Sequence, residues 1–300
     1  MEERPLVSVI INCYNGEAYL RAALESVIRQ TYTHWEILFW DNQSTDSSRS
    51  IVDACQDSRI NYFYAPTHTL LYDARNQAIV HAKGELLAFL DVDDWWEPKK
   101  LEKQVALFAD EKVALVYANY WIVLEKKQSC RVAYPRQLPE GPVALDELLR
   151  SYPVGMLTLM IRRSLVSEMD GPFDPRYHII GDFDLVIRLA SRHPIACVQE
   201  PLASYRIHGS NESITKRETT VAELELWESE MARDPIIGKN RFFGTVRSTI
   251  QYFRSVNDLL GNQRIKAFKG AFNLPFGKLK IRLLGACFLP LFLIRLLRVK

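Results

Sequence analysis

Cysteine is scarce in this chain of 300 residues, and its five cysteines lie far apart. None of them belongs to a C-x-x-C pair, which excludes a zinc ribbon and a dithiol redox motif of the usual spacing. We therefore expect reduced thiols in a cytosolic protein. The five are Cys13, Cys55, Cys130, Cys197 and Cys287.

A strong overall charge and a membrane-length apolar run are also missing. The formal net charge of +2 is too small for a typical nucleic-acid binder, so we expect no nucleic-acid partner. The apolar run 6–11 is too short, and its flank too acidic, for a signal peptide, which predicts a cytoplasmic location. With 48% hydrophobic and 25% charged residues, the composition is typical of a globular protein.

Acidic residues are absent from the last 42 residues, 259–300, which contain nine Lys or Arg. An apolar run of twelve residues, 283–294, lies among them. A bilayer span needs about 20 apolar residues, so this segment favours peripheral attachment to an anionic membrane surface. The alternative is a buried core helix with basic ends.

Strand and helix patterns alternate along the first part of the chain. Continuous apolar runs predict strands, and apolar residues at spacings of three and four predict helices. This alternation predicts an α/β fold with a right-handed parallel sheet. The expected strands are 7–11, 36–40, 60–64, 86–90, 113–118 and 156–161. The expected helices are 20–28, 44–55, 74–82, one that begins at residue 98, 183–192 and a helical region 217–258. Residues 120–142 have an irregular pattern, and residues 196–205 have a mixed one.

Three carboxylates, Asp91, Asp93 and Asp94, directly follow the strand expected at 86–90. Like charges this close raise one another's pKa, so such a cluster indicates a cation site. In open α/β sheets, ligands bind at this end of the strands. A metal-dependent phosphatase of the haloacid dehalogenase type is an alternative, although there the motif ends the first strand. A catalytically inactive, membrane-docked scaffold is a third possibility.

Several segments, in this order, resemble glycosyltransferase family 2. They are Pro5–Gly16, Glu36–Asp46, Ala74–Asn76, and Ala82–Glu85 leading into Asp91–Asp94, followed by Gly181–Arg188 and Tyr205–Asn211. The resemblance covers about residues 5–213. It implies a GT-A fold, which is α/β and Rossmann-like with a mostly parallel mixed sheet. It also implies an inverting transfer of sugar from a nucleotide-diphosphate donor.

For the donor, the resemblance implies that Tyr14 and Asn15 lie against the base and ribose. Asp41 would accept a hydrogen bond from uracil N3–H, which favours a UDP-sugar, although guanine and thymine also present an N–H. Arg75 would reach the base or the phosphates. We read His68, in the following loop, as having no role in binding.

For the diphosphate, the resemblance implies that Asp91 contacts ribose or metal-bound water and that Asp93 ligates Mn²⁺ or Mg²⁺. Arg206 and His208 occupy the family's Tyr-Arg-x-His position and would face the diphosphate, His208 as a further metal ligand. A divalent cation stabilises the charge that develops on the leaving diphosphate.

Asp182 is the expected general base, because an inverting enzyme must take a proton from the acceptor hydroxyl. Many relatives have Glu-Asp where this chain has Gly181-Asp182. We expect Asp182 at a helix N-terminus, where the dipole lowers its pKa. The alternative is that Asp182 merely caps the helix, with Asp184 as an exposed acid in the first turn. If Asp182 proved dispensable and Asp184 essential, Asp184 would be the base.

The expected organisation has four parts. Residues 1–118 form the donor half and 119–215 the acceptor half, 216–258 a helical extension and 259–300 the basic tail. The acceptor is expected to be a glycan or lipid-linked saccharide of cell-surface polysaccharide synthesis, met at the cytosolic membrane face. The sequence does not identify the sugar, the acceptor or the linkage.

Overall fold

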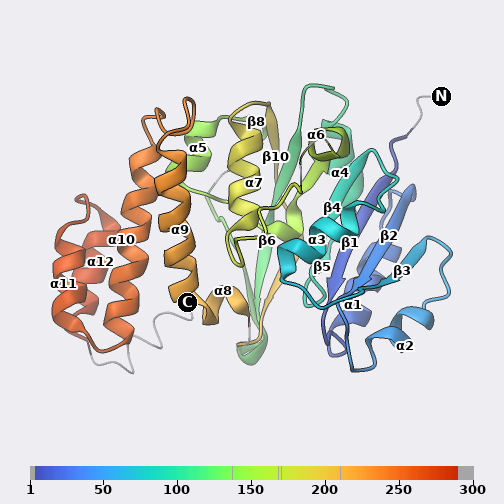
Figure 1. Cartoon of the computed structure of the whole chain (residues 1–300), viewed down its shortest axis with the longest axis horizontal. Coiled ribbons are helices and arrows are strands. Elements are labelled where there is room, and N and C mark those ends of the chain that lie inside the picture. Colours follow the sequence, from blue (N-terminus) through green and yellow to red (C-terminus); the bar gives the residue numbers. More distant parts are fainter. Residues whose placement is uncertain (1–3, 137, 168, 170, 210, 290–300) are drawn as a thin grey trace. The chain divides into compact units, whose positions relative to one another are not determined.

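The computed structural model describes residues 4–136, 138–167, 169, 171–209 and 211–289 (Figure 1). The chain divides into two compact units, residues 1–210 and 211–300. The first unit contains the whole β-sheet, and the second is helical.

Four parallel strands form the first half of the sheet, in the order β3-β2-β1-β4. These strands are β1 (Val7–Cys13), β2 (Trp35–Asp41), β3 (Ile60–Tyr64) and β4 (Leu86–Phe89). Every residue of β1 and β2 is buried, as expected for strands covered on both faces. The carboxyl ends of these strands place Tyr14, Asp41 and Asp91 along one edge of the sheet.

The second half of the sheet is mixed. Its strands are β5 (Trp95–Trp96), β6 (Leu115–Leu124), β7 (Ser129–Val132), β8 (Gly141–Val143), β9 (Met160–Arg162) and β10 (Ile195–Ile207). Strand β9 lies between β4 and β6 and is antiparallel to both, while β10 runs parallel to β6. The α/β class and the GT-A-like mixed sheet are confirmed; the alternation of strand and helix patterns indicated the parallel half of the sheet but not the antiparallel strands of the second half.

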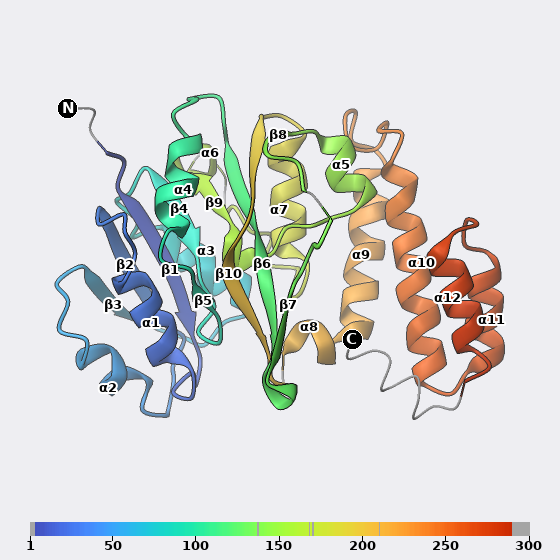
Figure 2. The ribbon, with the colours of Figure 1, turned by 180° about the vertical axis from the view of Figure 1, so that it is seen from behind.

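Helices cover both faces of the sheet (Figures 1 and 2). Leu24 of α1 and Leu101 of α4 pack in one large apolar core with the strands, and α3 and α7 lie on the opposite face (Figure 1). The helices of this unit are α1 (Leu20–Ile28), α2 (Ser48–Asp53), α3 (Leu71–Ile79), α4 (Lys100–Leu107), α5 (Leu145–Arg150), α6 (Arg163–Ser167) and α7 (Gly181–Ala190), with 3₁₀ turns at Glu125–Lys127 and Met156–Thr158.

Strand β6 differs most from expectation, because it continues through residues 118 and 119 to Leu124. The expected donor and acceptor halves therefore share one continuous sheet. The region expected to be mixed, 196–205, lies within the 13-residue strand β10, whose register against β6 shifts at Val198, Pro201 and Ser204. The functional division at residue 118 stays a prediction.

The second unit consists of helices with a small apolar core of their own, which includes Leu259, Leu274 and Leu283. Its helices are α8 (Glu212–Thr215), α9 (Arg217–Met231), α10 (Phe243–Leu260), α11 (Arg264–Phe272) and α12 (Lys278–Ala286). Within the described residues, no helix has the length and apolar character needed to cross a bilayer. Residues 290–294 of the predicted apolar run lie outside the described residues.

Candidate active site

Tyr14 and Asn15 follow β1 directly, as predicted. The Tyr14 side chain is 55% exposed, and its ring centroid lies 4.4 Å from that of His68. Asn15 has a positive φ of 53°, and its Oδ1 accepts the Thr45 N–H at 2.8 Å. His68 is itself held in place, because its Nδ1 lies 2.8 Å from the Asn42 carbonyl oxygen. The two rings form an aromatic surface at this edge of the sheet, which makes His68 a candidate that the sequence reading left out.

Asp41 ends β2 as predicted, but it is only 1% exposed. One carboxylate oxygen accepts a hydrogen bond from the Tyr62 hydroxyl at 2.6 Å, and the other accepts a hydrogen bond from the Ser44 N–H at 2.7 Å. Burial, with this hydrogen bond to Asp41, raises the pKa of Tyr62 to about 12. Asp41 thus organises the loop after β2, and its contact with a base stays a prediction.

The acidic cluster follows β4, and each of its carboxylates has a different partner. Asp91 forms an ion pair with the buried Arg75 of α3. Asp93 Oδ2 lies 2.9 Å from His208 Nε2. Burial, and then the charge of Asp91, raises the pKa of Asp93. The neighbouring Asp94 is almost fully buried, and burial and its two acidic neighbours raise its pKa further.

Arg206 joins the end of β10 to this cluster, 113 residues away in sequence from Asp93. Its Nε donates to the Asp93 carbonyl oxygen at 2.9 Å, and its backbone N–H donates to Asp94 Oδ1 at 2.9 Å. The guanidinium lies 4.5 Å from the Tyr19 ring centroid and 4.6 Å from that of Trp95. The structure thus brings Arg206 and His208, which belong to one sequence motif, against Asp93, which belongs to another.

Two donors in this cluster are close enough to share one cation. Among the described residues, no group of three or more His, Cys, Asp or Glu side chains is arranged to hold a metal ion. Mg²⁺ and Mn²⁺ in nucleotide sites nevertheless take only one or two protein ligands, with substrate phosphates and water supplying the rest. Asp93 and His208 fit such a site, and a bound cation would oppose the effects of burial and of the Asp91 charge that raise the pKa of Asp93.

Asp182 lies in the first turn of α7, as predicted, and accepts a hydrogen bond from the Tyr72 hydroxyl at 3.0 Å. The N-cap position is Ile180, so Asp182 is not the cap of this helix. The expected direction of its pKa is wrong. Burial raises the pKa of Asp182 above its usual range, and the hydrogen bond from Tyr72 and the charge of Arg75 only partly oppose that effect.

The capping alternative also placed Asp184 at the surface, whereas Asp184 is only 4% exposed. Its carboxylate pairs with Arg188, one turn along α7, at 2.7 Å. This pairing favours Asp182 over Asp184 as the base. Gly181 has a specific role in the same turn, since a Cβ there would lie 2.7 Å from carbon atoms of the Tyr72 ring.

Helix α3 connects the two halves of this site. Tyr72 and Arg75 are three residues apart on one face of the helix, Tyr72 contacting Asp182 and Arg75 contacting Asp91. The sequence reading missed Tyr72, for which the spacing from Arg75 was the available signal. It also missed Tyr19 and Glu125, whose side chains share a 3.0 Å hydrogen bond beside Arg206.

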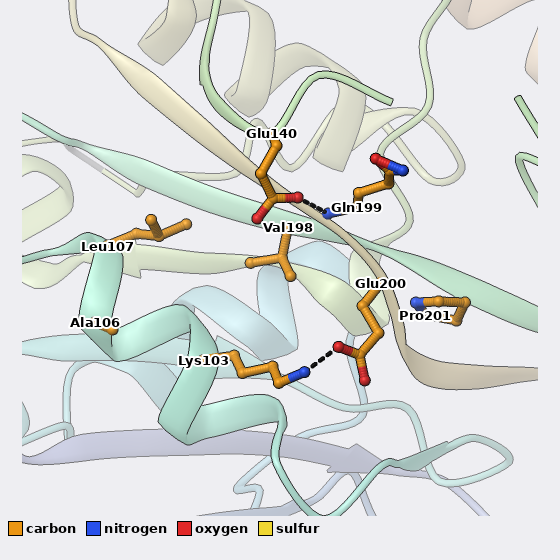
Figure 3. A pocket seen from close by; sticks show the side chains of 8 residues that line it. All are labelled: Lys103, Ala106, Leu107, Glu140, Val198, Gln199, Glu200 and Pro201. Atoms are coloured by element: carbon orange, nitrogen blue, oxygen red, sulfur yellow. Dashed lines mark hydrogen bonds and ion pairs between the residues drawn. The ribbon is translucent and has the colours of Figure 1, made fainter. Parts of the chain in front are cut away.

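A separate hollow of about 670 Å³ lies between α4 and the irregular part of β10 (Figure 3). The Lys103 ammonium pairs with Glu200 there, and the Gln199 N–H donates to Glu140. None of the residues predicted for catalysis lines this hollow. It is therefore not the site of the chemistry considered below.

Comparison with known proteins adds independent information. WfgD of Escherichia coli, named as a UDP-Glc:alpha-D-GlcNAc-diphosphoundecaprenol beta-1,3-glucosyltransferase, is 33% identical over 168 residues, which are 56% of this chain and 64% of WfgD. The chain thus spans slightly less than two thirds of that relative.

Two solved structures share the fold. S. aureus TarS 1-349 in complex with UDP-GlcNAc has a TM-score of 0.66 at 16% identity, covering 88% of this chain and 79% of that one. The mannosyltransferase PcManGT from Pyrobaculum calidifontis, in complex with GDP-Man and Mn²⁺, has a TM-score of 0.63 at 18% identity, covering 95% of this chain and 79% of that one.

The family model described as glycosyl transferase family 2 matches residues 8–168, more than half of the chain. This match decides against the phosphatase alternative and confirms the resemblance seen in the sequence. The chain belongs to glycosyl transferase family 2.

Proposed function

We propose that this protein transfers a sugar, with inversion, from a UDP-sugar to a saccharide or lipid-linked acceptor. The observation that carries the proposal is the pair of contacts made by α3, from Tyr72 to Asp182 and from Arg75 to Asp91. One rigid helix thereby fixes the expected base and the expected donor-binding acid with respect to each other. Such fixed positions supply the orientation that a displacement at a single carbon requires.

The donor is proposed to lie along the strand ends, with its base against Tyr14 and Asn15 and its diphosphate toward Arg206. The aromatic ring of Tyr14 offers a stacking surface for a base. Asp41 favours uridine, because its carboxylate would accept a hydrogen bond from uracil N3–H once the loop after β2 adjusts. The two structural neighbours hold a UDP-sugar and a GDP-sugar, so the preference for uridine rests on Asp41 together with WfgD, whose name specifies a UDP-Glc donor.

Asp93 and His208 would hold Mn²⁺ or Mg²⁺ beside the diphosphate. The cation would supply positive charge where the leaving diphosphate becomes more negative. Arg206 adds a second, permanent positive charge, and its guanidinium is oriented by its contact with the Asp93 carbonyl oxygen. Arg75 neutralises Asp91, which limits the negative charge facing an anionic donor.

Asp182 is proposed to remove the proton from the acceptor hydroxyl as that oxygen attacks the anomeric carbon. The new glycosidic bond forms while the bond from the anomeric carbon to the diphosphate oxygen breaks. The proton passes to the Asp182 carboxylate, and the nucleoside diphosphate leaves on the opposite face of the sugar. The raised pKa of Asp182 makes it a better proton acceptor than an ordinary aspartate.

The acceptor is proposed to be lipid-linked and to belong to cell-surface polysaccharide synthesis, reached at the cytosolic face of the membrane. Support comes from WfgD, whose name specifies a diphosphoundecaprenol acceptor. Residues 119–215 are proposed to contribute the acceptor site, since this half carries Asp182.

Incubation with a panel of sugar nucleotides and Mn²⁺, followed by measurement of released nucleoside diphosphate, tests the proposal. We expect hydrolysis of a UDP-sugar that stops when the metal is chelated. Asp93→Ala should abolish the release, while Asp53→Ala, which removes an exposed acid paired with Arg49, should not. Failure of every donor to turn over in the folded wild-type protein would favour the inactive scaffold instead.

A further inference from the structure

Helix α11 in the second unit has two apolar faces, and only one of them is used in packing. Ala267, Gly270 and Ala271 are buried, and a Cβ on Gly270 would lie 2.2 Å from Ser255 Oγ of α10. Ile265, Phe268 and Phe272, spaced by three and four residues, form a second stripe that is exposed. Ile265 is 75% exposed and Phe272 is 65% exposed. This second stripe is not explained by the core of the unit.

Helix α12 repeats the arrangement. Leu283 and Cys287 are buried in the core of the unit, whereas Ile281 and Phe288, seven residues apart, are exposed. The ring centroids of Phe288 and Phe268 lie 6.0 Å apart, so the exposed stripes of the two helices adjoin. Phe276, in the connection between the helices, is 89% exposed. We term six exposed apolar residues of α11, α12 and the segments that follow them the phenylalanine surface: Ile265, Phe268, Phe272, Phe276, Ile281 and Phe288.

Basic residues accompany this surface on both helices. Lys266 and Lys269 of α11 and Lys278 and Arg282 of α12 are exposed. Lys280 is used differently, since its ammonium donates to the carbonyl oxygens of Phe272 and Leu274 at the end of α11. From residue 259 to the end of the sequence there is no Asp or Glu. An apolar surface on helices whose charged residues are all basic fits an anionic, partly apolar partner.

We propose that the phenylalanine surface docks on the surface of an anionic lipid bilayer, with its apolar side chains among the headgroups and its basic side chains against lipid phosphates. Amphipathic helices of this composition bind membranes through buried apolar area combined with attraction to anionic lipids. A second copy of the chain fits less well, because a symmetric contact would bring basic residues against basic residues without any acid between them.

This surface differs from the apolar run expected from the sequence. Two residues of that run, Leu283 and Cys287, face the core of the unit and are not available to lipid. Most of the phenylalanine surface lies before the run, in α11 and the connection to α12. The proposal rests on the second unit alone and does not depend on the proposed sugar transfer.

Cosedimentation of the full-length chain with vesicles tests the proposal without any sugar nucleotide. We expect binding to mixed phosphatidylcholine and phosphatidylglycerol vesicles that weakens as salt is added, and weak binding to phosphatidylcholine alone. The double variant Phe272→Ser/Phe276→Ser should lower partitioning by about tenfold or more, because each phenylalanine contributes apolar burial. Lys266→Gln and Lys269→Gln should each lower it by about fivefold on anionic vesicles.

Ile236→Ser is the matched control, since Ile236 is a 48% exposed apolar residue of the same unit outside α11 and α12. It should bind vesicles like the wild type, and all variants should retain the wild-type circular dichroism spectrum and donor hydrolysis. Unchanged vesicle binding of the double variant, or no binding by the wild type, would overturn the proposal. It would also be overturned if the double variant converted a wild-type dimer into monomers in analytical ultracentrifugation, since the surface would then join two copies.

Discussion

The hydroxyl of Tyr72 gives a direct way to test whether Asp182 is the general base. Tyr72→Phe removes the donor that lies 3.0 Å from Asp182 Oδ1, while the ring can keep its stacking on Phe173 at a centroid distance of 5.2 Å. The base must be ionised to accept a proton, and this hydrogen bond lowers the pKa of Asp182. Its loss raises that pKa, so the acid limb of the pH–rate profile should move to higher pH.

The size of the effect follows from the charge on the acceptor of this hydrogen bond. Hydrogen bonds to ionised groups contribute about 1.5–3 kcal/mol, which corresponds to roughly tenfold or more in the rate of transfer on the acid limb. The rate on the alkaline plateau should stay near that of the wild type, because Asp182 is ionised there in both proteins. A loss of rate that is equal at every pH would indicate a structural role of Tyr72 instead.

The assay is kcat/KM for transfer as a function of pH at saturating donor, with donor hydrolysis as a second readout. Tyr32→Phe is the matched control, because the hydroxyl that the buried Tyr32 loses donates to the Pro5 carbonyl oxygen and not to Asp182. Asp182→Asn should lower transfer by about 10² or more at every pH, the scale of a missing general base.

Asp184→Asn provides the contrasting result for the same helix. It breaks a buried pair with Arg188 and should cost about 3–5 kcal/mol of stability, with transfer retained by the folded fraction. An acid limb that does not move in Tyr72→Phe, together with an active Asp182→Asn, would refute the assignment of the base. A folded but inactive Asp184→Asn would then identify Asp184 as the residue responsible.

Three further substitutions test other parts of the site. Asp93→Ala should abolish metal-dependent transfer and donor-dependent Mn²⁺ binding without unfolding the protein, and full activity at saturating Mn²⁺ would contradict the metal assignment. Gly181→Ala should displace the Tyr72 ring, because the new Cβ would lie 2.7 Å from its carbon atoms. This variant should reproduce the pH shift of Tyr72→Phe and lose about 1–3 kcal/mol of stability. A pH–rate profile that does not shift would argue against the contact between Tyr72 and Asp182. Asp41→Asn should lower the melting temperature, because the Ser44 N–H and the Tyr62 hydroxyl both donate to this carboxylate. It should also raise KM for UDP-sugars. An unchanged KM would show that Asp41 does not contact the nucleotide base.

The strand ends of the first half of the sheet were predictable because each depends on local pattern. Continuous apolar runs identified β1 to β4, and the residues that follow them, Tyr14, Asp41 and Asp91, came with them. Strand β9 was not identifiable as an antiparallel insertion. It has only three residues, and its pairing with β4 joins Met160 to Ala88 across the sheet. Such pairing is fixed by tertiary packing and leaves no periodic signal.

Contacts between distant segments set the limit for the site as well. Tyr72 and Asp182 are 110 residues apart, and Tyr19 and Glu125 are 106 apart, so no spacing in the sequence brings them together. The resemblance of motifs identified Arg206 and His208 and implied that His208 shares a metal with Asp93, but it did not reveal that Arg206 donates to the Asp93 carbonyl oxygen. The burial of Asp184 was not predictable for the same reason, since it depends on what α7 packs against.

The pKa of Asp182 was predicted in the wrong direction because two opposing effects act on one carboxylate. A helix N-terminus stabilises an anion by about 0.3–1 kcal/mol near the surface, whereas burial can cost an ionised carboxyl several times that amount. The pKa of Asp182 is higher in the folded protein than in the unfolded chain. The folded state therefore loses stability as the pH rises from the pKa of the unfolded chain through the pKa of the folded protein. The ionised base therefore lowers the stability of the protein at neutral pH while it improves proton transfer. Asp182→Asn removes that charge, and Asn can still accept the Tyr72 hydroxyl, so the inactive variant should unfold at a temperature equal to or above that of the wild type.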